Sequence, residues 1–241
     1  MKKLPILLMT MFTLTACDKD IQLVFETQHI DQYTNAKIDI KYPQAVGKEP
    51  IAKNINEVIE HTIATDMNIT DPEEKKMSIK EAAAQFDQEF KKFKTDFQDS
   101  AQQWEVKVDG DVVFESANVI SVVIDSYIDT GGAHGNSVVT YLNFNPQTGA
   151  LLEENDLLKK PSEFKTIAEK AFKEQTKPKD TDETMEDFFF GEEFQLPANM
   201  GFSQEGFVLL YNNYEIASYA QGTTKIILPY EKIKDQLKVL P

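Results

Sequence analysis

The chain has 241 residues, a single cysteine and no arginine, and its 40 acidic residues outnumber its 25 lysines. The formal charge of −15 argues against a nucleic-acid partner, because a phosphate backbone would be repelled and no guanidinium is present to clamp phosphates. One cysteine allows neither an internal disulfide nor a cysteine metal site, so a hydrophobic core must stabilise the fold.

The first seventeen residues have the pattern of a lipoprotein signal peptide. Lys2 and Lys3 precede an apolar run that ends in Leu14-Thr15-Ala16-Cys17 and is too short to remain as a membrane span. Loss of the two lysines on cleavage takes the formal charge from −15 to −17. We therefore expect Cys17 to be lipidated and to anchor the chain to a membrane of the cell envelope. Asp18 resembles an inner-membrane retention signal, which in a Gram-negative organism implies the periplasmic face of the inner membrane.

Two amphipathic helices are predicted after a half-buried strand at residues 34–42. The first begins near Pro50, and the second begins near Ser78, where Glu81 is placed to complete a capping box. The second helix carries phenylalanines at helical spacing, which predicts a core stripe: Phe86, Phe90, Phe93 and Phe97.

Residues 104–108, 112–116 and 118–128 predict successive antiparallel strands, with a turn at Asp109-Gly110-Asp111 between the first two. Helices grouped apart from a run of strands indicate an α+β fold, with antiparallel sheets and segregated amphipathic helices.

Three glycines within five positions interrupt two predicted strands at Gly131-Gly132-Ala133-His134-Gly135. Glycine allows positive φ and close backbone approach, so we expect a tight loop whose geometry requires all three glycines. Beyond the loop, residues 138–144 predict a strand, and a helix is expected to begin near Pro161. Four phenylalanines follow an acid-rich stretch, and they could form either core or an exposed anchor for a partner: Phe188, Phe189, Phe190 and Phe194.

Two separated segments resemble the RsiV-like family. The segment from Tyr127 to Asn136 is similar to the family's YTGGAHGN-type signature, and an N-x-x-T-G turn follows it at residues 145–149. Residues 206–233 are similar to the family's Y-x-x-Y-E-I-A-P-Y-A-x-G and I-P-Y ending, with Ser218 in place of the usual proline. The predicted organisation is a signal peptide at 1–17, an N-terminal α+β module at 18–136 that ends in the TGGAHG loop, and a C-terminal RsiV-like α+β module at 137–241.

The resemblance implies a binding function at the cell envelope. The family is known from the extracellular part of an anti-sigma factor that senses lysozyme, and from modules attached to peptidoglycan deacetylases. It implies recognition of lysozyme or another cationic wall-active protein. The alternatives to this binding function are a structural lipoprotein that associates with peptidoglycan and, third, an enzyme that modifies the cell wall. The implied ligand contacts lie in the glycine loop: Tyr127, Asp129, Gly131, Gly132, His134, Gly135 and Asn136.

His134 is the one candidate for chemistry, and two non-catalytic interpretations stay open for it: bonding to the loop backbone or contact with a partner. The sequence contains neither a G-x-S-x-G elbow nor an H-E-x-x-H or H-x-x-x-H pattern. We therefore expect no catalytic residue, no metal and no cofactor, and we expect that the protein is not an enzyme.

We predict that Cys17→Ser releases the protein from the membrane fraction or leaves its signal peptide uncleaved, because serine has no thiol to acylate. Metabolic palmitate labelling followed by membrane fractionation measures both effects. A membrane fraction and a palmitate signal that Cys17→Ser leaves unchanged would refute lipidation at this residue.

Overall fold

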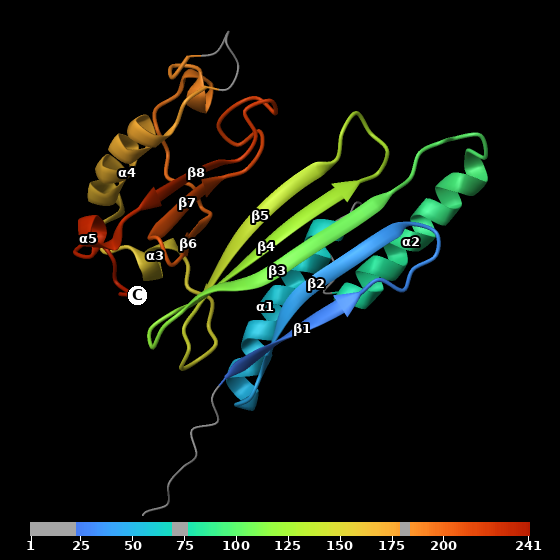
Figure 1. Cartoon of the computed structure of the whole chain (residues 1–241), viewed down its shortest axis with the longest axis horizontal. Helices are drawn as coiled ribbons and strands as arrows, with labels where there is room; N and C mark the ends of the chain where they lie inside the picture. The colour runs from blue at the N-terminus through green and yellow to red at the C-terminus, as the bar shows by residue number, and fades with distance from the viewer. Residues whose placement is uncertain (1–22, 69–76, 179–183) are drawn as a thin grey trace, which may run out of the picture.

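The computed structural model describes residues 23–68, 77–178 and 184–241, and Cys17 lies outside these residues. Within them are two sheets accompanied by helices (Figure 1). The larger sheet has five strands in the order β1-β2-β3-β4-β5, and the smaller has three in the order β6-β7-β8. This arrangement confirms the predicted α+β class.

The five-stranded sheet consists of β1 (Val24–Ile30), β2 (Lys37–Val46), β3 (Glu105–Glu115), β4 (Ile120–Asp129) and β5 (Asn136–Phe144). Its helices are α1 (Glu49–Met67) and α2 (Ile79–Asp96). The second sheet consists of β6 (Met200–Phe202), β7 (Phe207–Tyr211) and β8 (Thr224–Leu228), and is accompanied by α3 (Glu154–Leu157), α4 (Pro161–Gln175), the 3₁₀ helix η1 (Phe188–Gly191) and α5 (Tyr230–Ile233).

One strand pair departs from the antiparallel prediction. β2 and β3 run parallel, with Lys37 opposite Glu105 and Lys41 opposite Asp109. Helices α1 and α2 connect these two strands and lie behind the sheet in Figure 1, so the chain re-enters the sheet from the same end. The remaining pairs of named strands are antiparallel.

The predicted turn at Gly110 is wrong, because β3 continues through it from Glu105 to Glu115. A Cβ at Gly110 would lie 2.9 Å from Ile124 Cδ1 and 3.0 Å from Pro43 Cδ. Gly110 therefore allows the neighbouring strands to approach closely. A glycine between two aspartates suggests a turn in the sequence, but here it is required by tight packing within the sheet.

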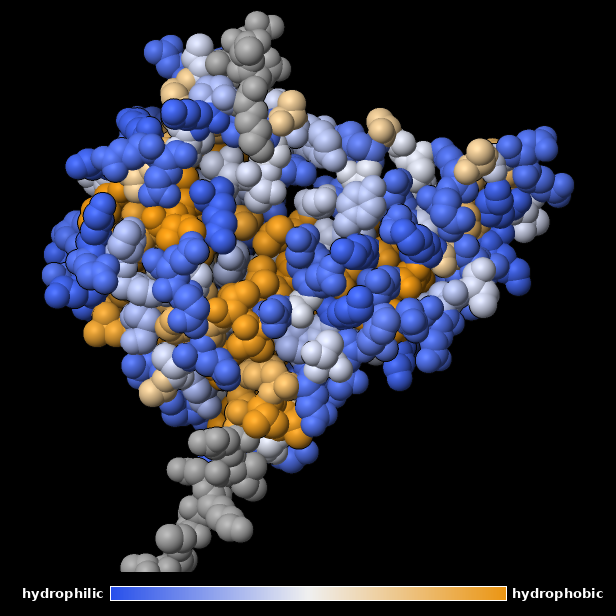
Figure 2. All heavy atoms as spheres, viewed as in Figure 1, coloured by the Kyte–Doolittle hydropathy of each residue, from blue (hydrophilic) through white to orange (hydrophobic). Residues whose placement is uncertain are grey.

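The first core lies between the five-stranded sheet and its two helices. Residues 38 and 40 of β2 are buried against the helices, whereas Lys37, Asp39 and Lys41 alternate with them on the opposite face. That opposite face is turned toward the viewer in Figure 2, where hydrophilic side chains cover much of it. The alternation explains why one face of the sheet carries the core while the other meets solvent.

The phenylalanine stripe of α2 enters this core only in part. Phe86 and Phe90 are buried and pack on Trp104 at ring-centroid distances of 5.5 and 5.6 Å. Phe93 is half-buried, and Phe97 at the end of the helix is 60% exposed. The capping box forms as predicted: the Ser78 side chain accepts from the Glu81 backbone N–H at 3.3 Å, and the Ser78 N–H donates to Glu81 Oε2 at 2.9 Å.

The second core lies between the three-stranded sheet and α4 and contains most of the later phenylalanines. Phe188, Phe189 and Phe194 are buried around Phe172 of α4, with ring-centroid distances of 5.3 to 5.6 Å. Phe190 is 65% exposed. The sequence left open whether these phenylalanines form core or an exposed anchor. Three of the four belong to the core, and Phe190 is exposed.

Side-chain amides join the two sheets. Asn212 accepts from the Val139 N–H at 2.8 Å and donates to the Val139 carbonyl at 3.0 Å, as a neighbouring strand would. Asn199 accepts from the Tyr141 N–H at 2.8 Å and donates to Val139 O at 2.6 Å. These bonds satisfy the outer edge of β5, which would otherwise expose unpaired backbone groups.

The five-stranded sheet extends past the predicted module boundary between residues 136 and 137. β5 pairs with β4 from Asn136 opposite Ile128 to Phe144 opposite Ile120. The division into two modules stays a prediction, and the strand that follows the glycine loop completes the first sheet.

Two aspartates that the fold shields from solvent, Asp87 and Asp66, have pKa values shifted in opposite directions. Asp87 of α2 is 8% exposed, and burial by itself would raise its pKa. Its carboxylate accepts hydrogen bonds from the Asn35 side chain and from the Asn35 and Ala36 N–H groups. These bonds outweigh the effect of burial, so the pKa of Asp87 is lowered. Asp66 of α1 accepts a hydrogen bond from the Ser126 hydroxyl at 2.7 Å, but burial outweighs this bond and raises the pKa of Asp66.

We predict that Asp87→Asn lowers and Asp66→Asn raises the melting temperature at neutral pH. A lowered folded-state pKa stabilises the protein above the unfolded value of 3.8, so the Asp87→Asn deficit should close as pH falls below that value. A raised folded-state pKa destabilises it at neutral pH, so the Asp66→Asn gain should shrink as pH falls toward 3.8. Thermal unfolding between pH 7 and pH 3 measures both trends.

Asp99→Asn provides a control, because it removes one negative charge at an exposed position of the chain. Equal and pH-independent effects of the two variants would contradict the assignment of opposite electrostatic roles.

Candidate functional site

The glycine loop between β4 and β5 packs against residues 212–222, which connect β7 to β8. The His134 ring stacks on Tyr219 with a centroid distance of 3.8 Å and an interplanar angle of 17°. Its Nε2 lies 3.2 Å from the Tyr214 hydroxyl, and its Nδ1 lies 2.9 Å from the Gly135 carbonyl. We call Tyr127, His134, Tyr214 and Tyr219 the aromatic junction, because they bring both sheets to one surface.

Hydrogen bonds fix the conformation of the glycine loop that carries His134. Asp129 accepts from the Gly131 N–H at 2.7 Å through Oδ1 and from the Tyr127 hydroxyl at 3.3 Å through Oδ2. The Gln102 side chain donates to the Gly131 carbonyl from the segment that precedes β3. Asp129 therefore ties the loop backbone and an aromatic side chain to one carboxylate.

The three glycines have different roles. Gly131 has φ +80°, and a Cβ there would also lie 2.6 Å from Gln102 Cδ. Gly135 is buried, and its Cβ would lie 2.4 Å from the Tyr127 ring. The prediction that Gly132 is required is wrong, because its φ is ordinary and the nearest atom to an added Cβ is His134 O at 3.8 Å. It is exposed and has space for a side chain.

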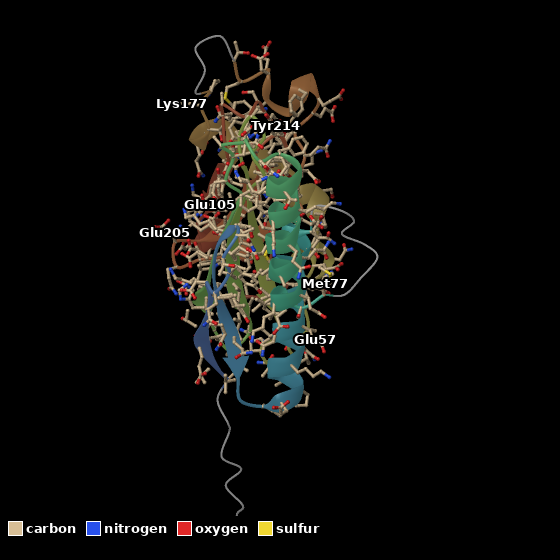
Figure 3. All side chains as sticks on the ribbon, turned by 90° about the vertical axis from the view of Figure 1, so that its right-hand side faces the viewer. Glu57, Met77, Glu105, Lys177, Glu205 and Tyr214 are labelled. Atoms are coloured by element: carbon tan, nitrogen blue, oxygen red, sulfur yellow. The ribbon has the colours of Figure 1, made fainter. Side chains whose placement is uncertain are left out.

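Tyr214 has an unusual backbone for an aromatic residue. Its φ is 65°, which is rare for a residue with a Cβ, and its side chain is 56% exposed. Such strain persists only where the surroundings enforce it, and it is frequent at ligand-binding positions. Figure 3 shows Tyr214 in the upper part of the molecule, and its ring lies 6.1 Å from that of His134 in the glycine loop, measured between centroids.

Two carboxyl groups, those of Asp129 and Glu215, lie in the segments that form the junction. Partial burial, and then the Asp129 carboxylate, raise the pKa of Tyr127, so this phenol stays neutral at physiological pH. Burial also raises the pKa of Glu215, although the Asn212 N–H donates to that carboxylate at 2.8 Å. The junction therefore places the Tyr127 phenol beside the Asp129 carboxylate.

Most of the predicted contact residues lie together in the structure. Tyr127, Asp129, Gly131, His134 and Gly135 interact within the loop. Asn136 is exposed at the start of β5, opposite Ile128. Both interpretations of His134 agree with its contacts, since one ring nitrogen meets the loop backbone and the other meets Tyr214.

Sequence reasoning missed three contributors to the site: Gln102, Tyr214 and Tyr219. The two tyrosines belong to the Y-E-I-A-S-Y-A segment, which carries the family resemblance but gives no sign of a contact with His134. Gln102 lies outside every motif, and its bond to Gly131 comes from the fold alone. In the described part of the chain, no group of three or more His, Cys, Asp or Glu side chains is arranged to hold a metal ion.

Residues 31–137 match the family model described as Deacetylase PdaC, and residues 155–231 match the one described as Protein of unknown function, DUF3298. The two matched segments follow one another along the chain and are separated by residues 138–154. The aromatic junction unites the two, since Tyr127 and His134 belong to the PdaC match, and Tyr214 and Tyr219 to the DUF3298 match. These families indicate a protein of the cell envelope.

Solved structures share this fold across nearly the whole chain. A DUF3298 family member from Bacteroides fragilis NCTC 9343 has 19% identity and a TM-score of 0.68, covering 90% of this chain and 94% of that one. A DUF3298 family protein from Pseudomonas aeruginosa PAO1 has 18% identity and a TM-score of 0.59, covering 91% and 96%. No curated protein matches the chain. None of the helices among the described residues is long and apolar enough to cross a membrane.

We predict that alanine at the three loop glycines destabilises the folded chain to different extents. Gly131→Ala should cost about 1 kcal/mol or more because of its positive φ. Gly135→Ala should also destabilise, since Tyr127 must move, whereas Gly132→Ala should stay within about 0.5 kcal/mol of the wild type. Chemical denaturation measures all three, and an equal cost at Gly131 and Gly132 would contradict the backbone assignment.

Proposed function

We propose that this protein is a lipid-anchored, RsiV-like binding protein of the cell envelope, and that its aromatic junction recognises lysozyme or another cationic wall-active protein. The observation that carries the proposal is the stacking of His134 on Tyr219 at 3.8 Å beside the exposed Tyr214. This contact makes one surface from the two segments that resemble the RsiV-like family.

The composition of the junction suits a protein interface. Tyrosine supplies a large, rigid contact area with few rotatable bonds, and it is enriched among residues that dominate binding energy. Three tyrosines and a histidine form the junction, and the backbone of Tyr214 has a positive φ that few residues with a Cβ adopt. A partner that covers the Tyr214 ring would bury apolar area without first ordering a mobile loop.

Charge supplies a physical reason for a cationic partner. The whole chain carries −15, and Asp129 and Glu215 lie in the segments that form the junction. A field of this sign attracts basic proteins and accelerates their association, while close contacts determine how long they stay bound.

Binding without turnover is part of the proposal. The PdaC match carries the description of a deacetylase, but the junction in this chain offers one histidine whose two nitrogens already meet Gly135 O and the Tyr214 hydroxyl. A peptidoglycan ligand is the second candidate, because the exposed face of Tyr214 is also suited to stacking on a sugar ring.

We predict a saturable 1:1 complex between the chain beginning at Asp18, which contains every described residue, and egg-white lysozyme at physiological salt. Tyr214→Ala should weaken it at least about tenfold, because tyrosine is enriched among the interface residues whose truncation costs about 2 kcal/mol or more. Association should slow as salt rises, while dissociation changes less. Calorimetry and surface plasmon resonance measure these effects.

Cytochrome c, which is also small and basic, tests whether charge alone is responsible. Equal binding of cytochrome c, or loss of the lysozyme signal by about 0.15 M salt, where the Debye length is still roughly 8 Å, would reject specific recognition. Binding of glycan fragments in place of lysozyme would favour the peptidoglycan alternative. Wall hydrolysis or deacetylation that disappears in His134→Ala would require the enzyme alternative.

A further inference from the structure

A second exposed aromatic residue is held in the left-handed region of the backbone. Phe189, Phe190 and Gly191 of η1 have φ values of 59°, 54° and 81° in succession. Phe189 is buried, and its N–H donates to the Ile216 carbonyl at 2.7 Å, which ties this turn to the segment that carries Tyr214. Phe190 has the same strained backbone but is 65% exposed, so core packing does not explain its side chain.

A groove lies beside this turn. It has a volume of about 300 Å³, with Phe172, Phe188, Phe189 and Phe194 among the residues that line it. Met185, which is 36% exposed, and Gly191 also line the groove. Phe190 and Met185 thus place exposed apolar groups next to a concave surface with an aromatic floor.

The border of the groove is strongly acidic. Four glutamates and one lysine line it, and that lysine, Lys173, is paired with Glu169 at 2.6 Å. Within the described residues, no ion pair involves Glu186, Glu192 or Glu193. Three carboxylates are therefore available around an apolar centre, and the complementary surface has lysine or arginine side chains around an apolar one.

We propose that this groove, with Phe190 and Met185, is a second docking surface for a folded basic protein. The two apolar side chains would cover an apolar part of the partner, and Glu186, Glu192 and Glu193 would receive its lysine or arginine side chains. Aromatic side chains in the floor add attraction for a cation that enters the groove. The partner class rests on the proposed function, and the surface is distinct from the aromatic junction.

The strain at Phe190 makes the proposal testable. Glycine adopts φ 54° without a steric penalty, so Phe190→Gly should unfold at the wild-type temperature or about 2 °C above it. The same change should weaken lysozyme binding at least about fivefold, because it removes an exposed contact. Glu192→Gln with Glu193→Gln should slow association more than an equal change of charge elsewhere.

Matched controls are available at the end of α2. Phe97→Ala removes a phenylalanine that is 60% exposed, and Asp96→Asn with Asp99→Asn changes the net charge by the same amount as the paired glutamate variant. Both controls should bind like the wild type. Binding that falls equally in the controls and in the groove variants overturns the proposal.

A titration with lysozyme, followed by NMR, separates this proposal from the proposed function. The methyl signal of Met185, assigned with Met185→Leu, reports on the groove, and the ring signals of His134 report on the aromatic junction. Shifts at Met185 support the docking surface, whether or not His134 responds. A response at His134 alone overturns the docking surface and leaves the proposed function standing, whereas no response at either site rejects both.

Discussion

The hydrogen bonds of Asn199 and Asn212 to the outer edge of β5 are the constraint on which the rest of the structure depends. They replace a sixth strand, so the second sheet meets the first through side-chain amides. The contact is reciprocal, because Asn143 donates to the Met200 carbonyl and Ser121 accepts from the Phe202 N–H. Fixing β6 and the end of β7 here also fixes the segment that brings Tyr214 and Tyr219 to His134.

The same chemistry protects other strand edges. Asn56 of α1 accepts from and donates to the backbone of Ala45, and Gln175 of α4 does the same at Ile227 of β8. An amide side chain has an NH₂ group that donates and a carbonyl oxygen that accepts, so it satisfies both backbone groups of a strand edge without inviting another chain to pair there. These amide contacts thereby limit nonspecific association of the chain by strand pairing.

Strain and exposure coincide at two aromatic residues, Tyr214 and Phe190. A sequence chosen for stability alone would place glycine or asparagine at these φ values. Both residues instead present rings to solvent, at 56% and 65% exposure. The buried Phe189 joins their segments by its bond to Ile216 O, so the strain is supported by the second core.

Local patterns in the sequence determined α1, α2 and α4, the capping box of α2 and the α+β class, because side-chain periodicity and capping act over a few residues. They also identified the glycine loop and His134. Only the tertiary structure decided that β2 and β3 are parallel, that Gly110 lies within a strand, and that Gly132 is free of geometric constraint. The pairing of His134 with Tyr214 and Tyr219, 80 and 85 positions away, likewise depends on how the sheets meet, and no local pattern contains that information.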